Sequence, residues 1–143
     1  MSKVMQAIHE GWEAILRRDI DEAERLFLEA TKAEPEVADG WNGIGAVHFE
    51  KGELELSLKS YEHALKAAKK ASGGTLPSRL AWDDDGKPAL RAVHGIGINR
   101  FRMGHLDEAI EAFEQLLALN PDDNQGAHFL LQDAKKKKSL WKK

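Results

Sequence analysis

Residues 42–52 read NGIGAVHFEKG, and residues 94–104 read HGIGINRFRMG. The two stretches share three glycines, an isoleucine and a phenylalanine at identical spacing. Further columns repeat in phase with them, namely Gly11, Gly45 and Gly97; Ala23, Ser57 and Ala109; and Phe27, Tyr61 and Phe113. The first step has the same length in every column, and the second step is longer by the length of the segment 72–89. A step of about 34 residues is typical of a helix–turn–helix repeat, so we expect three repeats with an insertion before the third.

The repeated glycines indicate close helix packing. They lie inside helical patterns, where glycine costs about 1 kcal/mol relative to alanine. Such a cost is tolerable where a neighbouring helix must approach closely, and an aromatic column then fills the adjoining space. Gly52 and Gly104 are expected to end helices in the left-handed conformation. Pro35 and Pro121 are expected to stop the second helix of their repeats, because the residue before proline is pushed out of the α region.

The pattern resembles that of the tetratricopeptide repeat family, W-x2-L-G-x2-Y, then A-x3-F, then P. Residues 41–69 read W-x2-I-G-x2-H, then S-x3-Y, with lysine in place of the proline. Residues 93–121 read V-x2-I-G-x2-R, then A-x3-F, then P. Residues 7–35 begin with alanine and glutamate where tryptophan and leucine are usual, then match with G, A-x3-F and P. Three copies in phase cover nearly the whole chain apart from the insertion and the basic tail.

The resemblance implies an all-α, right-handed α-solenoid formed by a single domain over residues 1–143. We expect repeats at about 4–37, 38–71 and 90–123, an insertion at 72–89, and a capping helix with a basic tail at 124–143. The helices are expected at about 3–17, 20–33, 37–50, 54–71, 88–102, 106–119 and 123–138. Asp19 and Asn120 are expected to cap the N-termini of the helices that follow them.

The insertion carries apolar residues that an exposed loop does not need, Leu76, Leu80 and Trp82. We expect these side chains to fold back onto the second and third repeats. Asp85-Gly86 predicts a turn that leads into a helix with Pro88 in its first turn. Two interpretations stay open: the insertion shapes or plugs a binding groove, or it covers a gap in the helix stacking.

Catalytic and metal-binding signals are weak. The chain has no cysteine, which excludes disulfides, thiol nucleophiles and cysteine-ligated metal sites. There is no H-E-x-x-H pair, no phosphate loop and no G-x-S-x-G elbow, and residues 83–86 lack the spacing of a calcium loop. His9, His94 and His128 belong to first-position helices, where a metal site is one interpretation and ordinary surface or partner contacts are the other. We expect no enzyme activity, no cofactor and no metal.

Composition bounds the partner and the compartment. Residues 133–143 hold six lysines and one aspartate, a charge of +5, whereas the whole chain carries −3. The remaining residues therefore carry −8, so nucleic acid is not the expected partner of the body. The lysine-rich tail could bind an anionic membrane surface or a polyanion, or it could complement the acidic body. Without a long apolar run or a signal peptide, the expected location is cytoplasmic.

The family resemblance implies a concave surface lined by the first helix of each repeat. Gly43 and Gly95 precede the packing glycines by two positions, so we expect them to face this groove and to open a floor for a ligand backbone. The candidate partner-binding residues are Ile8, His9, Trp12, Asn42, Gly43, Phe49, Arg91, His94, Gly95, Ile98, Phe101, Arg102 and His128. The alternative for the aromatic members of this set is internal packing.

The family's known grip on a C-terminal carboxylate uses lysine, asparagine and arginine on the first helices. Of the matching positions here, only Arg91 is basic, so we expect a hydrophobic or extended segment as the ligand. The predicted function is a non-catalytic protein–protein interaction module, an adaptor, scaffold or chaperone-like protein that binds a peptide segment or helix. The alternatives are a structural homo-oligomer assembled through the N-terminal helix (Val4, Met5, Ile8 and Trp12) and a polyanion or membrane-surface binder acting through the tail.

Overall fold

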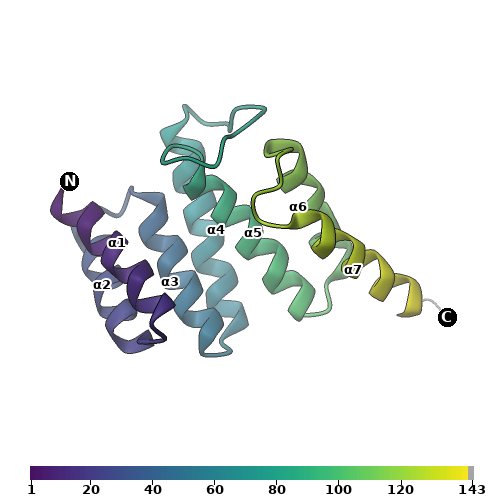
Figure 1. Ribbon diagram of the computed structural model, residues 1–143, viewed down its shortest axis with the longest axis horizontal. Helices are drawn as coiled ribbons and strands as arrows, with labels where there is room; N and C mark the ends of the chain where they lie inside the picture. The colour runs from purple at the N-terminus through teal and green to yellow at the C-terminus, as the bar shows by residue number, and fades with distance from the viewer. Residues whose placement is uncertain (142–143) are drawn as a thin grey trace.

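The computed structural model describes residues 1–141, which form seven α-helices arranged in one row from the N-terminus to the C-terminus (Figure 1). The helices are α1 Lys3–Leu16, α2 Ile20–Ala33, α3 Ala38–Glu50, α4 Leu54–Ala71, α5 Lys87–Arg102, α6 Leu106–Leu119 and α7 Ala127–Trp141. We call α1, α3 and α5 the first helices of the three repeats, and α2, α4 and α6 the second helices. The helix α3 contacts both α1 and α5, and each first helix packs against the second helix of its own repeat. The predicted all-α solenoid is thereby confirmed. Over the described residues, no helix is both long and apolar enough to cross a membrane.

A buried phenylalanine of α2 sets the distance between α1 and α3. The Phe27 ring is fully buried and lies between Gly11 of α1 and Gly43 of α3. A Cβ atom would lie 2.7 Å from this ring at Gly11 and 2.2 Å from it at Gly43. Both distances are below any real contact between carbon atoms, so only glycine lets the two first helices clasp the ring from both sides.

Tyr61 of α4 takes the same place between α3 and α5. A Cβ atom would lie 2.8 Å from its ring at Gly45 and 2.5 Å from it at Gly95. A buried polar contact joins the same helices, because the Ser57 hydroxyl donates to the Gly45 carbonyl over 2.7 Å and accepts from Asn99 Nδ2 over 2.9 Å. Burial of polar groups is inexpensive when they bond to one another in this way. The second repeat therefore copies the packing of the first.

In the third repeat, the aromatic ring packs against its own first helix as before, but its packing against the following helix differs. Phe113 of α6 is fully buried and packs against Gly97 of α5, where a Cβ atom would lie 2.5 Å from the ring. On its other side, Phe113 shares a buried cluster with Ala134 of α7. The position of α7 that aligns with Gly43 and Gly95 is Phe129, which is 72% exposed. The helix α7 thus presents a different face to the row than α3 and α5 do.

Most of the predicted helix ends are confirmed. Gly52 and Gly104 have φ angles of 77° and 83°, the left-handed conformation that favours glycine. The two second helices that precede Pro35 and Pro121 end at Ala33 and Leu119, just before the proline. Asp19 caps α2, because its carboxylate accepts from the backbone amide of Glu22 over 3.3 Å.

The predicted start of the capping helix is wrong. The helix α7 begins at Ala127, because the chain makes a loop after Asn120 in which Asp123 has a φ of 53°. The Asp123 carboxylate accepts from the backbone amides of Ala127 and His128, so it provides the cap that was expected from Asn120. The Asn120 side chain instead donates to the Leu80 carbonyl in the insertion over 3.0 Å. This partner is distant in the chain, beyond the reach of local capping rules.

The segment between α4 and α5 folds back onto the helices, as its apolar residues predicted (Figure 1). Leu76 and Leu80 pack against Ala68 and Ala89 at the junction of the second and third repeats. The backbone amide of Leu80 donates to the Leu119 carbonyl over 2.7 Å, which ties the segment to the end of α6. The insertion therefore covers this end of the stacked helices.

Candidate functional site

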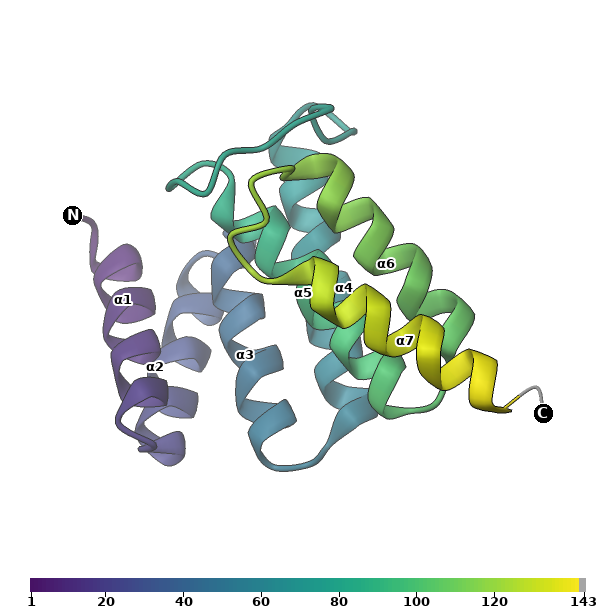
Figure 2. The same ribbon diagram turned by 45° about the vertical axis from the view of Figure 1, so that its right-hand side comes forward.

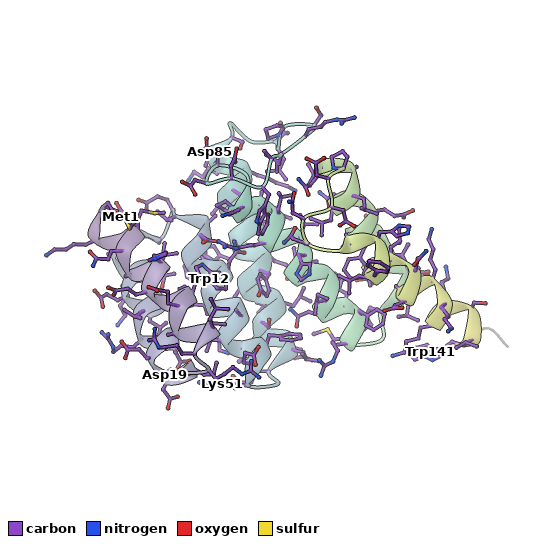
Figure 3. All side chains as sticks on the ribbon, in the orientation of Figure 1. Met1, Trp12, Asp19, Lys51, Asp85 and Trp141 are labelled. Carbon is purple, nitrogen blue, oxygen red and sulfur yellow. The ribbon has the colours of Figure 1, made fainter. Side chains whose placement is uncertain are left out.

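An almost fully buried carboxylate joins the three first helices. Asp39 of α3 is 7% exposed, and its Oδ2 atom accepts from Trp12 Nε1 over 2.9 Å and from Arg91 Nη1 over 2.7 Å. Its Oδ1 atom accepts from Asn42 Nδ2 over 2.9 Å. Trp12, labelled in Figure 3, thus reaches from α1 to α3, and Arg91 reaches from α5. With both oxygens bonded, one of them to a cation, the charge is stabilised despite its burial.

The cation of this group lies close to two indole rings. The Arg91 guanidinium lies 4.7 Å from the ring centroid of Trp12 and 5.7 Å from that of Trp82. Lys87 lies 5.5 Å from the same Trp82 ring. Arg91 is therefore held by Asp39 and by aromatic faces, and its side chain is 28% exposed. The insertion, through Trp82, contributes to the first-helix face as well as covering the helix ends.

A second group of aromatic rings and cations runs across α3, α5 and α7. Arg102 lies 5.4 Å from the ring centroid of Phe49, and Lys137 lies 5.2 Å from that of Phe101. The Phe49, Ile98 and Phe101 side chains are half-buried, whereas Arg102 is exposed. We call Phe49, Ile98, Phe101, Arg102 and Lys137 the aromatic–cation patch. An apolar surface edged by cations is suited to a segment that carries apolar and acidic side chains.

Four of the predicted groove residues are buried in the packing. Gly43 and Gly95 do not open a groove floor, because the space beside them is filled by the aromatic rings of the preceding second helices. Ile8 is 3% exposed and belongs to the core of the first repeat. Asn42 is fully buried, with its amide nitrogen bonded to Asp39 and, over 2.8 Å, to the Pro88 carbonyl. The expectation that Gly43 and Gly95 open a groove floor is therefore wrong.

The predicted histidines have different surroundings. His9 is exposed beside Glu13 at 3.5 Å, and His128 is exposed with its ring 5.9 Å from that of Phe129. His94 is partly buried, and this burial lowers the pKa of its imidazole. Over residues 1–141, no three His, Cys, Asp or Glu side chains are grouped so that they could hold a metal ion.

Sequence reasoning missed the role of Asp39 and of Lys137. A signal for Asp39 was present, since the step from Asp39 to Arg91 equals the step from Gly45 to Gly97 in the repeated columns. An acid and a base at equivalent positions of neighbouring first helices are expected to meet. Lys137 carried no such signal, because it lies inside a run of four lysines and only the docking of α7 distinguishes it.

The surfaces behind the two alternative functions are reduced in the structure. Of the four residues of the N-terminal helix, Val4 and Ile8 are buried, Met5 is 45% exposed and Trp12 is half-buried. In the lysine run, Lys138 forms an ion pair with Asp107 of α6 and Lys137 lies against rings. Lys135 and Lys136 are exposed, and Lys142 and Lys143 lie outside the described residues.

Two hollows are lined mainly by second helices. One of about 430 Å³ lies between α4, α5 and α6, and one of about 780 Å³ lies between α4 and the turn that joins α2 to α3. Arg100 forms ion pairs with Glu62 of α4 and Glu108 of α6 across the first hollow. None of the predicted groove residues lines either hollow.

Comparison with known proteins agrees with the packing. Residues 10–72 match one family model described as tetratricopeptide repeat, and residues 91–123 match a second with the same description. The chain is 28% identical over 116 residues to the protein CTR9 homolog of Arabidopsis thaliana, an alignment of 81% of this chain. This chain spans 9% of that relative's length.

A crystal structure of MamA protein covers 96% of this chain and 84% of its own, at 18% sequence identity and a TM-score of 0.40. The two family models together span most of the chain, and both fall on the helix pairs that clasp the buried rings. The chain belongs to the tetratricopeptide repeat family.

Proposed function

We propose that this protein is a non-catalytic binding module that holds a segment of another protein against its first-helix face. Tetratricopeptide repeats generally mediate protein–protein interactions and are typically non-catalytic. The observation that supports this face is the aromatic–cation patch, in which half-buried rings of α3 and α5 lie beside cations of α5 and α7. The partner is a peptide segment or helix whose apolar side chains contact Phe49 and Phe101 and whose carboxylate contacts Arg102.

The group around Asp39 and the aromatic–cation patch differ in how many polar groups they leave unbonded for a ligand. Around Asp39, the Trp12 indole nitrogen and one Arg91 nitrogen are already bonded within the protein. At the aromatic–cation patch, Arg102 is exposed and makes no ion pair within residues 1–141. A free guanidinium beside an apolar ring can form a charge-assisted hydrogen bond to a carboxylate. Binding energy is therefore expected to concentrate between α3, α5 and α7.

A display library of natural protein segments tests the proposal, with fluorescence anisotropy to measure the affinity of each selected peptide. Arg102→Glu and Phe49→Ser change the patch without touching the buried rings that hold the repeats together. We expect each to weaken peptide binding about tenfold or more, because a charge contact or an apolar anchor is lost. Lys59→Glu serves as the matched control, since Lys59 is an exposed lysine of α4 on a second helix.

The helical content and melting temperature of each variant must match those of the parent for the comparison to count. Peptides that bind all three variants equally would contradict the proposal. If binding instead falls only in Lys135→Gln/Lys136→Gln and decreases steeply with salt, the exposed lysines of α7 are the binding site and the patch is not.

A further inference from the structure

The capping helix has an unusual outer face. Its inner face is fixed to α6, with Ala127 and Ala134 buried and an ion pair between Lys138 and Asp107. Phe129 and Leu140 on the outer face are 72% and 56% exposed. Figure 2 shows α7 across the front of the molecule, and none of the other helices of residues 1–141 lies over it. The outer face of a capping helix is usually polar, so two large apolar side chains on it require an explanation.

The two apolar residues belong to one stripe with two charged residues. Phe129, Asp133, Lys136 and Leu140 follow one another at spacings of four, three and four, which places them along one side of the helix. Asp133 and Lys136 are exposed, and neither makes an ion pair within residues 1–141. We call these four residues the outer stripe of α7.

The outer stripe is complementary to itself when one copy is reversed. In an antiparallel helix pair, each stripe residue of one helix lies opposite a stripe residue of the other helix, and the two together form one layer of the interface. Phe129 then lies opposite Leu140 of a second copy, and Asp133 lies opposite Lys136 of that copy. The same two contacts recur on the other side of the two-fold axis, as an isologous interface requires. A parallel pair would place Asp133 opposite Asp133 and Lys136 opposite Lys136, so the charges select the antiparallel arrangement.

We propose that α7 is a self-association surface, through which a second copy of this chain binds antiparallel to the first. The outer layers are Phe129 with Leu140, and the inner layers are Asp133 with Lys136. A single helix pair is a small interface, so the dimer is reversible and forms as concentration rises. The surface is separate from the aromatic–cation patch, in which α7 takes part through Lys137.

Charge reversal on the full chain tests the arrangement, with sedimentation velocity over a micromolar to millimolar range as the readout. Asp133→Lys and Lys136→Asp each turn two attractive layers into two repulsive ones, so each is expected to weaken dimerisation about tenfold. The double variant D133K/K136D exchanges the charges and is expected to restore the dimer. A mixture of the two single variants should form a heterodimer, because every layer is again attractive.

Lys135→Asp is the matched control, since it makes the same change in charge at an exposed α7 position outside the outer stripe. It is expected to leave the dimer nearly unchanged, and Phe129→Ala is expected to weaken it. Circular dichroism shows whether each variant keeps its helices. A parent that stays monomeric throughout the range overturns the proposal. So does a dimer whose strength follows net charge alone, with Lys135→Asp equal to Lys136→Asp and no rescue by the double variant.

Discussion

The interfaces between neighbouring repeats and the interface between the third repeat and α7 pack the same kind of aromatic ring differently. Inside, Phe27 lies between two glycines, one from each first helix beside it. At the end, Phe113 lies between Gly97 and Ala134, and the residue aligned with the second glycine is an exposed phenylalanine, Phe129. A phenylalanine at this position has no room against the ring, and α7 instead packs against Phe113 through Ala134. The second glycine is what lets α3 and α5 close on the ring of the preceding second helix.

The largest expected effect comes from filling an internal ring slot. In Gly43→Val, the new Cβ atom would lie 2.2 Å from the Phe27 ring, so helices have to shift. We expect the free energy of unfolding to fall by about 3 kcal/mol, at the upper end of the usual cost of overpacking. Chemical denaturation followed by circular dichroism measures it.

Gly40→Ala is the control for this change, because its Cβ atom would meet the end of the Thr31 side chain at 3.0 Å rather than a ring. Its stability is expected to stay close to that of the parent. The cost of Gly43→Val should also shrink in a Phe27→Leu background, as a double-mutant cycle would show. An equal cost in both backgrounds would mean that the ring is not the cause.

A smaller effect is expected at the terminal interface. Ala134→Leu places a large side chain where a methyl group now contacts Phe113, at an estimated cost of about 1–2 kcal/mol. Because α7 packs against α6 at the end of the row, the loss should be local and should leave the first two repeats folded. Hydrogen exchange is expected to accelerate in α7 and α6 while the amides of α1 and α2 keep their protection. Uniform acceleration across all helices would show that α7 and α6 unfold together with the first two repeats, and would contradict the prediction.

The smallest effect concerns pH and compares equivalent positions of α3 and α5. His94 aligns with Asn42, and burial lowers the pKa of His94 below its ordinary value near 6.5. The unfolded chain therefore binds a proton more readily than the folded chain does. The contribution of neutral His94 to the free energy of unfolding is fully present above pH 6.5. It is lost as the pH falls from there toward the pKa of His94 in the folded chain. Urea denaturation at several pH values should show a decline that is reduced in His94→Asn and retained in His9→Asn, since His9 is exposed.

Local patterns predicted the helices well because each depends on residues close in sequence. The glycines at 52 and 104 end helices, and Asp19 caps one, through interactions within a single turn. The orientation of Gly43 and Gly95 was mispredicted, although the sequence held the clue. The step from Gly11 to Phe27 equals the step from Phe27 to Gly43, so the ring lies midway between its two glycines in the chain. The same rule assigns Gly95 to Tyr61 once the length of the insertion is subtracted.

The candidate site was harder to predict, because its side chains come from elements far apart in sequence. Trp12, Asp39, Trp82 and Arg91 meet only after three first helices and the insertion are in place. Lys137 reaches Phe101 because α7 docks through Ala134, which no local rule requires. Of the predicted groove residues, Ile8, Asn42, Gly43 and Gly95 are packed inside the structure, and the others are exposed or half-buried.

The sequence by itself determined the repeat, its period, the aromatic ring of each second helix and the glycines that receive it, because these follow from spacing and from the size of side chains. Only the tertiary structure decided which residue of α7 lies against the Phe113 ring, where α7 begins, and which polar groups are already bonded. The physical reason is that a side chain's exposure depends on neighbours brought together by packing. Spacing along one helix shows which residues share a face, but it does not show what covers that face.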